Sequence, residues 1–198
     1  MKRDAGTQSE ELYKDDWPLF EKMLGSLRYS KIKKYVMKDG VHCDIGCGYH
    51  GAFLKSISKQ IGYGYGFDWK VTPGREGNIE LINNRGIEGI PLEDESCDRV
   101  FMLAVLEHLE DAEAMVRECH RILKKGGILV LTTPTPIAKP ILEFLSFKLH
   151  LISRASIEEH KHYYSRPEMM EIFRKCGFSK AKYRKFMLGV NSLAVVLK

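Results

Sequence analysis

The fold of this chain is decided by one stretch of sequence, Asp44-Ile45-Gly46-Cys47-Gly48-Tyr49-His50-Gly51 (residues 44–51). It overlaps an apolar run at 41–45 that predicts a strand, and its glycines have the G-x-G-x-x-G spacing of nucleotide-binding turns. Asp68 lies 20 residues beyond Gly48, at the end of the next predicted strand. A carboxylate there can accept hydrogen bonds from both ribose hydroxyls. The pattern predicts a strand–turn–helix unit that binds a nucleoside cofactor.

The glycines alone do not choose between cofactors, but Asp44 does. A carboxylate two residues before the first glycine is expected beside the ligand, where it would repel a pyrophosphate. Like charges about 4 Å apart cost roughly 4 kcal/mol near a protein surface. Asp44 therefore favours a ligand that carries an ammonium and a sulfonium over a nicotinamide or flavin dinucleotide. Trp69 offers an apolar face to the adenine, and Cys47 is expected to be a small residue of the turn rather than a nucleophile.

Strands and helices alternate along most of the chain, which indicates an α/β fold with a mostly parallel, Rossmann-like doubly wound sheet. Two strands close the chain as an antiparallel hairpin with its turn at Gly189. The expected strands are 41–45, 63–67, 78–82, 98–103, 128–132, 181–187 and 192–197, and the expected helices are 8–37 (one or two), 53–61, 111–123 and 167–176.

Four ordered segments resemble one known family. They are DIGCGYHGAF, GFD, GIPLEDESCDRVFMLAVLEHLED and RECHRILKKGGILVLTTPTP, and the later EEHKHYYSRPEMMEIFRKCGF extends the likeness. The chain from about Arg28 to Lys198 resembles the class I S-adenosylmethionine-dependent methyltransferases, above all the type 11 group that contains the ubiquinone- and menaquinone-biosynthesis enzymes. The resemblance implies seven strands in the order 3-2-1-4-5-7-6, with strand 7 antiparallel.

The resemblance also implies a binding site for S-adenosylmethionine and its product S-adenosylhomocysteine. Residues 44–51 match the methionine-binding loop, Asp68 the ribose acid, and Leu103 the position under the methionine. At 86–91 the chain reads Gly-Ile-Glu-Gly-Ile-Pro, without the acid that many members use for the adenine amine, so backbone groups near Ile87 are expected to replace it. The expected cofactor-binding set is Asp44, Gly46, Cys47, Gly48, Gly51, Asp68, Trp69, Gly86, Ile87, Leu103 and His108.

Two histidines are candidate catalytic residues, although orientation alone can supply roughly 7–11 kcal/mol of a methyl-transfer barrier. His108 follows the fourth strand and can instead line the methionine pocket as a structural residue. His160 precedes the last helix and can instead be a plain loop residue. The expected acceptor-binding residues are Tyr13, Trp17, His160, Tyr163 and Tyr164. No metal site is expected, because Glu158, Glu159, His160 and His162 lack a diagnostic ligand spacing.

The length of 198 residues and 44% hydrophobic content suit a single globular domain. Its expected parts are an N-terminal helical cap (1–38), a cofactor-binding core (39–134), a lid or insertion (135–165), and the last helix with the terminal hairpin (166–198). The apolar segment 137–152 is open to three interpretations: a lid over an apolar or lipid-linked acceptor, an ordinary core or homodimer helix, or a peripheral membrane contact.

The charge distribution and the cysteines indicate which class of partner and which cell compartment to expect. The net charge of +5 comes from the end of the chain, where seven Lys or Arg follow from Arg174 onward without an acid. This suits an exposed edge strand or an anionic head group. Five cysteines without a CxxC pair, after a polar N-terminus without a signal peptide, predict reduced thiols in the cytoplasm.

The sequence thus predicts a methyltransferase for a small-molecule or lipid-linked acceptor. Nucleic acid is not favoured, because Leu103-Ala104-Val105-Leu106 stands where base-amine methyltransferases carry a D/N/S-P-P-aromatic motif. A non-catalytic regulator that binds S-adenosylmethionine stays an alternative, since binding and turnover share the same motifs.

Overall fold

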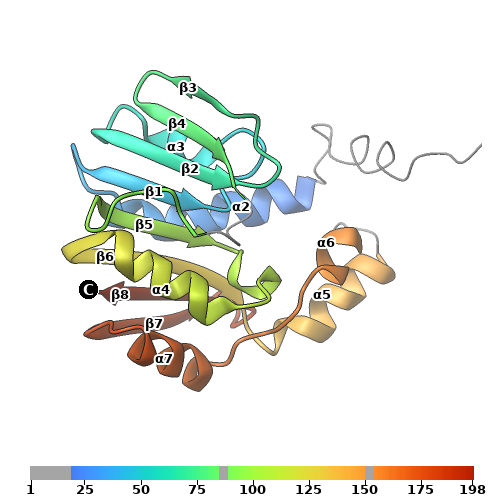
Figure 1. Cartoon of the computed structure of the whole chain (residues 1–198). Coiled ribbons are helices and arrows are strands. Elements are labelled where there is room, and N and C mark those ends of the chain that lie inside the picture. Colours follow the sequence, from blue (N-terminus) through green and yellow to red (C-terminus); the bar gives the residue numbers. More distant parts are fainter. Residues whose placement is uncertain (1–18, 85–88, 150–153) are drawn as a thin grey trace, which may run out of the picture.

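The computed structural model describes residues 19–84, 89–149 and 154–198. They form a single eight-stranded sheet in the order β3-β4-β2-β1-β5-β6-β8-β7, with helices on both of its faces (Figure 1). The strands are β1 (Val41–Ile45), β2 (Tyr63–Asp68), β3 (Gly74–Glu76), β4 (Ile79–Asn83), β5 (Cys97–Leu103), β6 (Leu123–Pro134), β7 (Lys180–Phe186) and β8 (Asn191–Leu197).

The expected strand order is confirmed, with one strand added at the edge. Strands β4, β2, β1, β5 and β6 run parallel, and β8 lies antiparallel to β6. Strand β7 pairs antiparallel with β8 as the predicted hairpin. The extra strand β3 pairs antiparallel with β4. Its three residues are all exposed and carry no apolar alternation, so the sequence pattern contained no signal for it.

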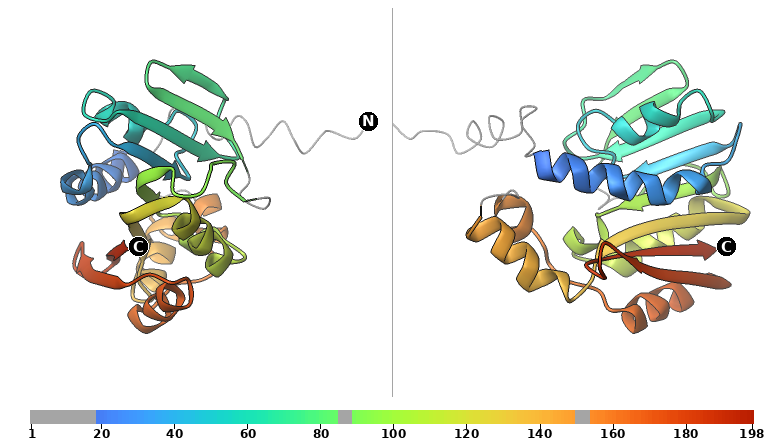
Figure 2. Two further views of the ribbon diagram at one scale, coloured as in Figure 1. Left: turned by 60° about the vertical axis from the view of Figure 1, so that its left-hand side comes forward. Right: turned by 180° about the vertical axis from the view of Figure 1, so that it is seen from behind.

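The helices are α2 (Leu19–Ile32), η1 (Lys33–Tyr35), α3 (Ala52–Ile57), η2 (Leu106–His108), α4 (Ala112–Ile122), α5 (Ala138–Phe147), α6 (Arg154–Glu158) and α7 (Arg166–Lys175). Helices α4 and α7 cover one face of the sheet, and α2 and α3 cover the other (Figure 2). Helices α5 and α6 lie beyond the carboxyl ends of the parallel strands (Figure 1). This edge is where open α/β sheets bind their ligands.

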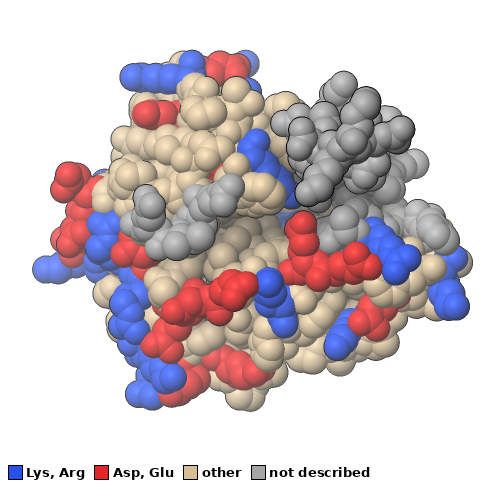
Figure 3. All heavy atoms as spheres, turned by 45° about the vertical axis from the view of Figure 1, so that its right-hand side comes forward, with Lys and Arg blue, Asp and Glu red and all other residues tan. Residues whose placement is uncertain are grey.

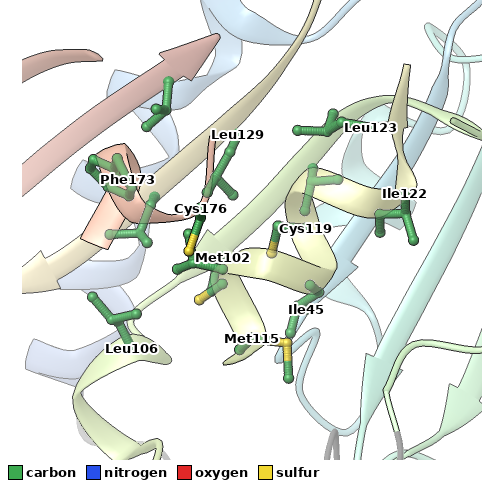
Figure 4. Close-up of a cluster of buried hydrophobic side chains, with 14 of the residues drawn as sticks. Ile45, Met102, Leu106, Met115, Cys119, Ile122, Leu123, Leu129, Phe173 and Cys176 are labelled. Atoms are coloured by element: carbon green, nitrogen blue, oxygen red, sulfur yellow. The ribbon is translucent and has the colours of Figure 1, made fainter. Parts of the chain in front are cut away.

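The larger hydrophobic core lies between the sheet, α4 and α7. Asp111 caps the N-terminus of α4, because its carboxylate accepts the Ala114 amide at 2.9 Å, and the apolar stripe of the helix faces β5 and β6. Figure 4 shows this stripe meeting the side chains of Phe173 and Cys176. Full burial of one such side chain contributes about 1.5–3 kcal/mol. The packing fixes β5, and with it the loop that follows β5 at the carboxyl edge.

Helix α4 passes into β6 without a loop. The sequence predicted that the helix stops at Lys124 to Gly127 and that the strand begins at Ile128, but the strand already begins at Leu123. Leu123 pairs with Cys97, and the register then shifts before Arg99. Lys124 binds the carboxylate of Asp98 with both contacts at 3.0 Å. The pairing of Leu123 with Cys97 and the contact of Lys124 with Asp98 thus make this basic segment part of strand β6.

Three further observations bear on the predicted surroundings. All five cysteines are free and buried, in agreement with the expected thiols. Strand β7 is an edge strand with exposed Lys180, Lys182 and Arg184, in agreement with the interpretation of the basic end. Within the described part of the chain, no helix combines the length and the hydropathy needed to cross a bilayer.

Candidate functional site

A cleft of about 540 Å³ opens at the carboxyl edge of the sheet. It lies where β1 and β5 diverge into loops, the point at which the strand order reverses. Segments far apart in the sequence line it, from α2, the ends of β1, β2, β5 and β6, and α5 and α6. Figure 3 shows the surface on this side, where basic and acidic side chains alternate around uncharged surface and Lys and Arg form no single patch.

The glycine turn forms one wall of the cleft. Gly46 and Gly48 have φ values of 76° and 71°, the left-handed region that favours glycine. A Cβ at Gly46 would overlap the side chain of Val105, whereas a Cβ at Gly48 would have no atom within 4 Å. Gly46 therefore allows the turn to close against the loop after β5, and Gly48 leaves backbone open to a ligand. Both line the cleft, and their predicted contact with the cofactor stays a prediction.

Asp68 stands at the end of β2 and faces the same cleft. One of its carboxylate oxygens accepts the Gly48 amide at 3.0 Å and the other accepts the Lys70 amide at 2.8 Å. These bonds fix the carboxylate beside the glycine turn, where a ribose can donate to its remaining lone pairs. Trp69 also lines the cleft and is 53% exposed, and the Lys70 ammonium lies over its ring, 4.4 Å from the centroid. The structure thus brings both residues to the same cleft, and their roles toward ribose and adenine stay predictions.

Asp44 differs from its prediction. It was expected beside the ligand, but its side chain is 2% exposed within β1 and is not among the residues that line the cleft. Its Oδ1 has no hydrogen-bond partner within residues 19–84, 89–149 and 154–198. Burial, and secondarily the charge of Asp68, hold the pKa of this carboxyl well above its ordinary value. A nearby cation would lower this cost, so an unsatisfied carboxyl behind the glycine turn fits a sulfonium and ammonium ligand better than a pyrophosphate.

Other predicted cofactor residues lie away from the cleft or outside the described residues. The Cys47 side chain packs toward Gly66 of β2, and Gly51 is buried at the start of α3, so neither lines the cleft. Burial raises the pKa of the Cys47 thiol, which suits a structural role. The residues outside the description are Gly86, Ile87, Tyr13 and Trp17.

The end of β5 forms the middle of the cleft. Leu103 lines it, as predicted, and Ala104 follows with φ at 57°, a conformation that is uncommon outside glycine. The Ala104 amide donates to the Thr132 carbonyl at 2.8 Å. Backbone held in a sparsely populated region often marks a ligand site. Here it turns the chain from the strand into η2, which carries Glu107 and His108.

His108 and His160 meet at the far side of the cleft, with ring centroids 4.7 Å apart. They are brought together by main-chain bonds, because the Glu107 carbonyl accepts the amides of Lys161 (2.7 Å) and His162 (3.3 Å). Burial, with the His108 charge as a lesser cause, lowers the pKa of His160 to about 4, so its imidazole is neutral at pH 7. Both predicted catalytic candidates therefore face the cleft.

The two tyrosines predicted to bind the acceptor lie outside the cleft lining. The Tyr163 hydroxyl lies 2.8 Å from His160 Nδ1 and thus supports that histidine from behind. Tyr164 packs against the core and contacts the ring of His162. His162 is half exposed and pairs with Glu168 at 2.9 Å, as expected for a solvated residue.

Sequence reasoning missed two charged residues of the cleft. Glu107 is 1% exposed, and its carboxylate accepts the Thr133 hydroxyl at 3.0 Å. Glu107 directly precedes His108 in the sequence, and nothing in the pattern distinguishes a buried carboxylate here from a surface one. Arg28 projects from α2 into the cleft, and its Nε has no hydrogen-bond partner among the described residues. Within a helical pattern, nothing distinguished Arg28 from the surface cations around it.

The predicted lid segment contributes an apolar wall. Leu142 of α5 and Ile157 of α6 line the cleft. The outer side of the same segment exposes further large apolar side chains, namely Ile137, Ile141, Phe144, Phe147 and Leu149. The segment is therefore apolar on two sides, one toward the cleft and one toward solvent.

Comparison with known proteins agrees with this geometry. A family model described as "Methyltransferase domain" matches residues 43–131, from β1 into β6. The chain is 27% identical over 141 residues to a ubiquinone/menaquinone biosynthesis C-methyltransferase of Desulfotalea psychrophila, which covers 64% of this chain and 52% of that protein. It is 26% identical over 194 residues to a demethylmenaquinone methyltransferase of Staphylococcus haemolyticus, covering 81% and 80%.

The fold has close relatives among solved structures. An S-adenosylmethionine-dependent methyltransferase from Archaeoglobus fulgidus matches with a TM-score of 0.65 at 17% identity, over 98% of this chain and 100% of that one. The chain spans about half the length of the first of the relatives named above. Family model, relatives, sheet order and glycine turn agree. The family model covers residues 43–131, and there the chain is similar to the class I S-adenosylmethionine-dependent methyltransferases.

Proposed function

We propose that this protein transfers the methyl group of S-adenosylmethionine to a small-molecule or lipid-linked acceptor. The observation that carries the proposal is the pairing of Asp68 with the Gly48 amide at the rim of a 540 Å³ cleft. The pair fits a ribose, and the buried Asp44 behind the turn fits the positive end of the same cofactor. The proposed cofactor position runs from Trp69, at the adenine, to Leu103, at the methionine.

Arg28 extends the proposal to the methionine carboxylate. Its guanidinium lies in the cleft with an unpartnered Nε, and burial lowers its pKa from the ordinary value. A guanidinium in such surroundings gains from a carboxylate that it can bind with two hydrogen bonds. The amino-acid end of the cofactor would supply that carboxylate between α2 and the glycine turn.

The acceptor would enter between the histidine pair and the lid. His108 and His160 are the candidate catalytic residues, in reach of an acceptor that approaches the sulfonium from the side opposite its leaving sulfur. Displacement at a sulfonium has a good leaving group, so alignment of acceptor and methyl with exclusion of water carries most of the rate. Leu142 and Ile157 would exclude that water.

Three features favour an apolar or lipid-linked acceptor. The cleft wall from α5 and α6 is apolar, the outer face of α5 exposes Ile141 and Phe144, and the relatives named above are quinone-biosynthesis methyltransferases. The exposed face of α5 would then lie against a membrane surface or a second copy of the chain. The five buried free thiols suit a reducing compartment, so we place the enzyme in the cytoplasm.

Two measurements test the proposal. Titration calorimetry with S-adenosylhomocysteine should show binding at one site, with NAD as a control that should not bind. Purified protein supplied with S-adenosylmethionine should then form S-adenosylhomocysteine with the lipid fraction of a cell extract. Turnover with the aqueous fraction alone would remove the lipid-linked acceptor, and binding without turnover in any fraction would leave a non-catalytic regulator. No binding of the cofactor product would overturn the whole proposal.

A further inference from the structure

The acceptor side of the cleft holds three side chains of the kinds that bind transition metals. A carboxylate oxygen of Glu107 and one ring nitrogen each of His108 and His160 lie within 4.8 Å of one another. All three residues line the cleft. Two imidazoles and a carboxylate form a ligand set for divalent Zn, Mn, Fe or Co ions, and three protein ligands leave positions for a substrate.

The groups behind these ligands are arranged as metal sites require. His108 Nδ1 lies 3.3 Å from the Glu159 carbonyl, which can only accept a hydrogen bond, so Nδ1 carries the proton and Nε2 keeps its lone pair. His160 Nδ1 lies 2.8 Å from the Tyr163 hydroxyl, whose oxygen can accept in the same way. The Thr133 hydroxyl holds Glu107 Oε2 at 3.0 Å. Each ligand thus has an outer partner that sets its orientation.

The burial of Glu107 and the charges around it also favour a bound cation. Glu107 is 1% exposed, its carboxylate accepts the Thr133 hydroxyl, and it lies near the positive charge of Arg28, so a metal cation would add to a compensation that these groups begin. Glu159 also lines the cleft and carries a further negative charge. Arg28 opposes a second cation, but its charge is offset when it binds the cofactor carboxylate proposed above.

We propose that Glu107, His108 and His160 bind a divalent transition-metal ion that receives an oxygen of the methyl acceptor. The sequence predicted no metal site, because the ligands considered with His160 were its neighbours in the chain. Glu107 and His108 lie more than 50 positions earlier. Glu107 and His108 are adjacent, and the main-chain bonds of the Glu107 carbonyl, with the contact of His108 to the Glu159 carbonyl, bring His160 to them. The ligand set became visible only in three dimensions.

The proposed role rests on the methyl transfer proposed above. A phenol or hydroquinone hydroxyl that binds the ion would lose its proton to water, because a divalent cation lowers the pKa of a bound oxygen acid. The ionised acceptor would then attack the methyl carbon as the carbon–sulfur bond breaks. Sulfur keeps the bonding electron pair, and neutral S-adenosylhomocysteine leaves. The metal ion is unchanged in charge and returns to the next acceptor.

Cobalt is the probe for the test, since Co²⁺ bound to imidazoles absorbs visible light. The full chain, stripped with a chelator and dialysed, is titrated with Co²⁺ in the presence of S-adenosylhomocysteine. One equivalent should bind with a visible spectrum, and His108→Ala, His160→Ala and Glu107→Gln should each weaken it at least tenfold. His162→Ala is the matched control, because this neighbouring histidine pairs with Glu168 outside the cleft and should leave the titration unchanged.

The outcomes separate the two proposals. Wild-type protein that binds S-adenosylhomocysteine but no Co²⁺ overturns the metal site and leaves the methyltransferase. Equal loss of Co²⁺ in His162→Ala and His160→Ala also overturns it, as does unchanged binding in the three ligand variants. Calorimetry with S-adenosylhomocysteine on every variant reports folding independently. A ligand variant that keeps this binding while it loses Co²⁺ supports the site.

Discussion

The two halves of the cleft are built in different ways. The cofactor half, with Gly46, Gly48 and Asp68, comes from consecutive strand ends within 25 residues of chain and is held by backbone amides. The acceptor half, with Glu107, His108 and His160, joins segments about 50 residues apart across a loop contact. Rigid strand ends suit a ligand common to the family, whereas a joined loop suits one that differs between members. We therefore expect variants of the cofactor half to lose cofactor binding and variants of the acceptor half to lose turnover.

The largest expected effect is on turnover and comes from the acceptor half. His160→Ala should lower kcat by about 100- to 10,000-fold, the range for loss of a catalytic group in proton transfer. It should leave the affinity for S-adenosylhomocysteine unchanged, because the cofactor half does not include it. Turnover assays and calorimetry on the same preparation give both numbers. Equal turnover in variant and wild type would remove His160 from the catalytic residues.

Next in size is a backbone effect in the cofactor half. Gly46→Ala places a Cβ into Val105 at a left-handed φ, and strain plus overlap should cost about 3 kcal/mol in stability and in cofactor binding. Gly48→Ala has the same φ region but open space, so it should cost only about 1 kcal/mol in stability. Thermal unfolding of the pair measures the difference. Equal losses would show that the contact with Val105 is unimportant.

A smaller effect is expected for the ribose carboxylate. Asp68→Ala should weaken S-adenosylhomocysteine by about 10- to 100-fold, the range for lost hydrogen bonds to a charged group. Asp68→Asn keeps one acceptor oxygen and should weaken it less. An unchanged dissociation constant in the alanine variant would contradict the proposed ribose position and, with it, the division of the cleft into halves.

The strand order was predictable from the resemblance to a known family, and the cofactor half was predictable because its signals are local. The glycine spacing and the distance from Gly48 to Asp68 encode a turn and a strand end directly, and the structure retains both. The burial of Asp44 was missed because period-2 alternation does not say which polar side chain of a fully buried strand reaches the ligand. The Glu107 cluster depends on a contact between distant loops, and no spacing in one sequence encodes such a contact.

The smallest predicted effect lies outside both halves, at the opposite end of β5. Partial burial raises the pKa of Asp98, but the Val41 amide and the Lys124 ammonium outweigh it and leave that pKa below its ordinary value. A lowered pKa stabilises the fold above the unfolded-state value near 4, and this stability is lost as pH falls through the folded-state value.

Asp98→Asn should therefore cost about 1 kcal/mol at pH 7, discounted for the 42% exposure of Lys124. The difference from wild type should shrink below about pH 4. Denaturant unfolding at both pH values, with cofactor binding as a control, checks this. A cost that does not change with pH would mean that the carboxylate charge is not what Asp98 contributes.

The Glu107 carbonyl, which accepts the Lys161 and His162 amides, has a consequence for how the proposed activity can diversify. Because these hydrogen bonds join main-chain atoms, exchange of the side chains at positions 158, 159, 161 and 162, with His160 kept, leaves the alignment of the two loops intact. New acceptors can thus be accommodated by substitutions on one short segment, while the glycine turn continues to bind the same cofactor. Libraries confined to that segment are the economical place to search for altered acceptor specificity.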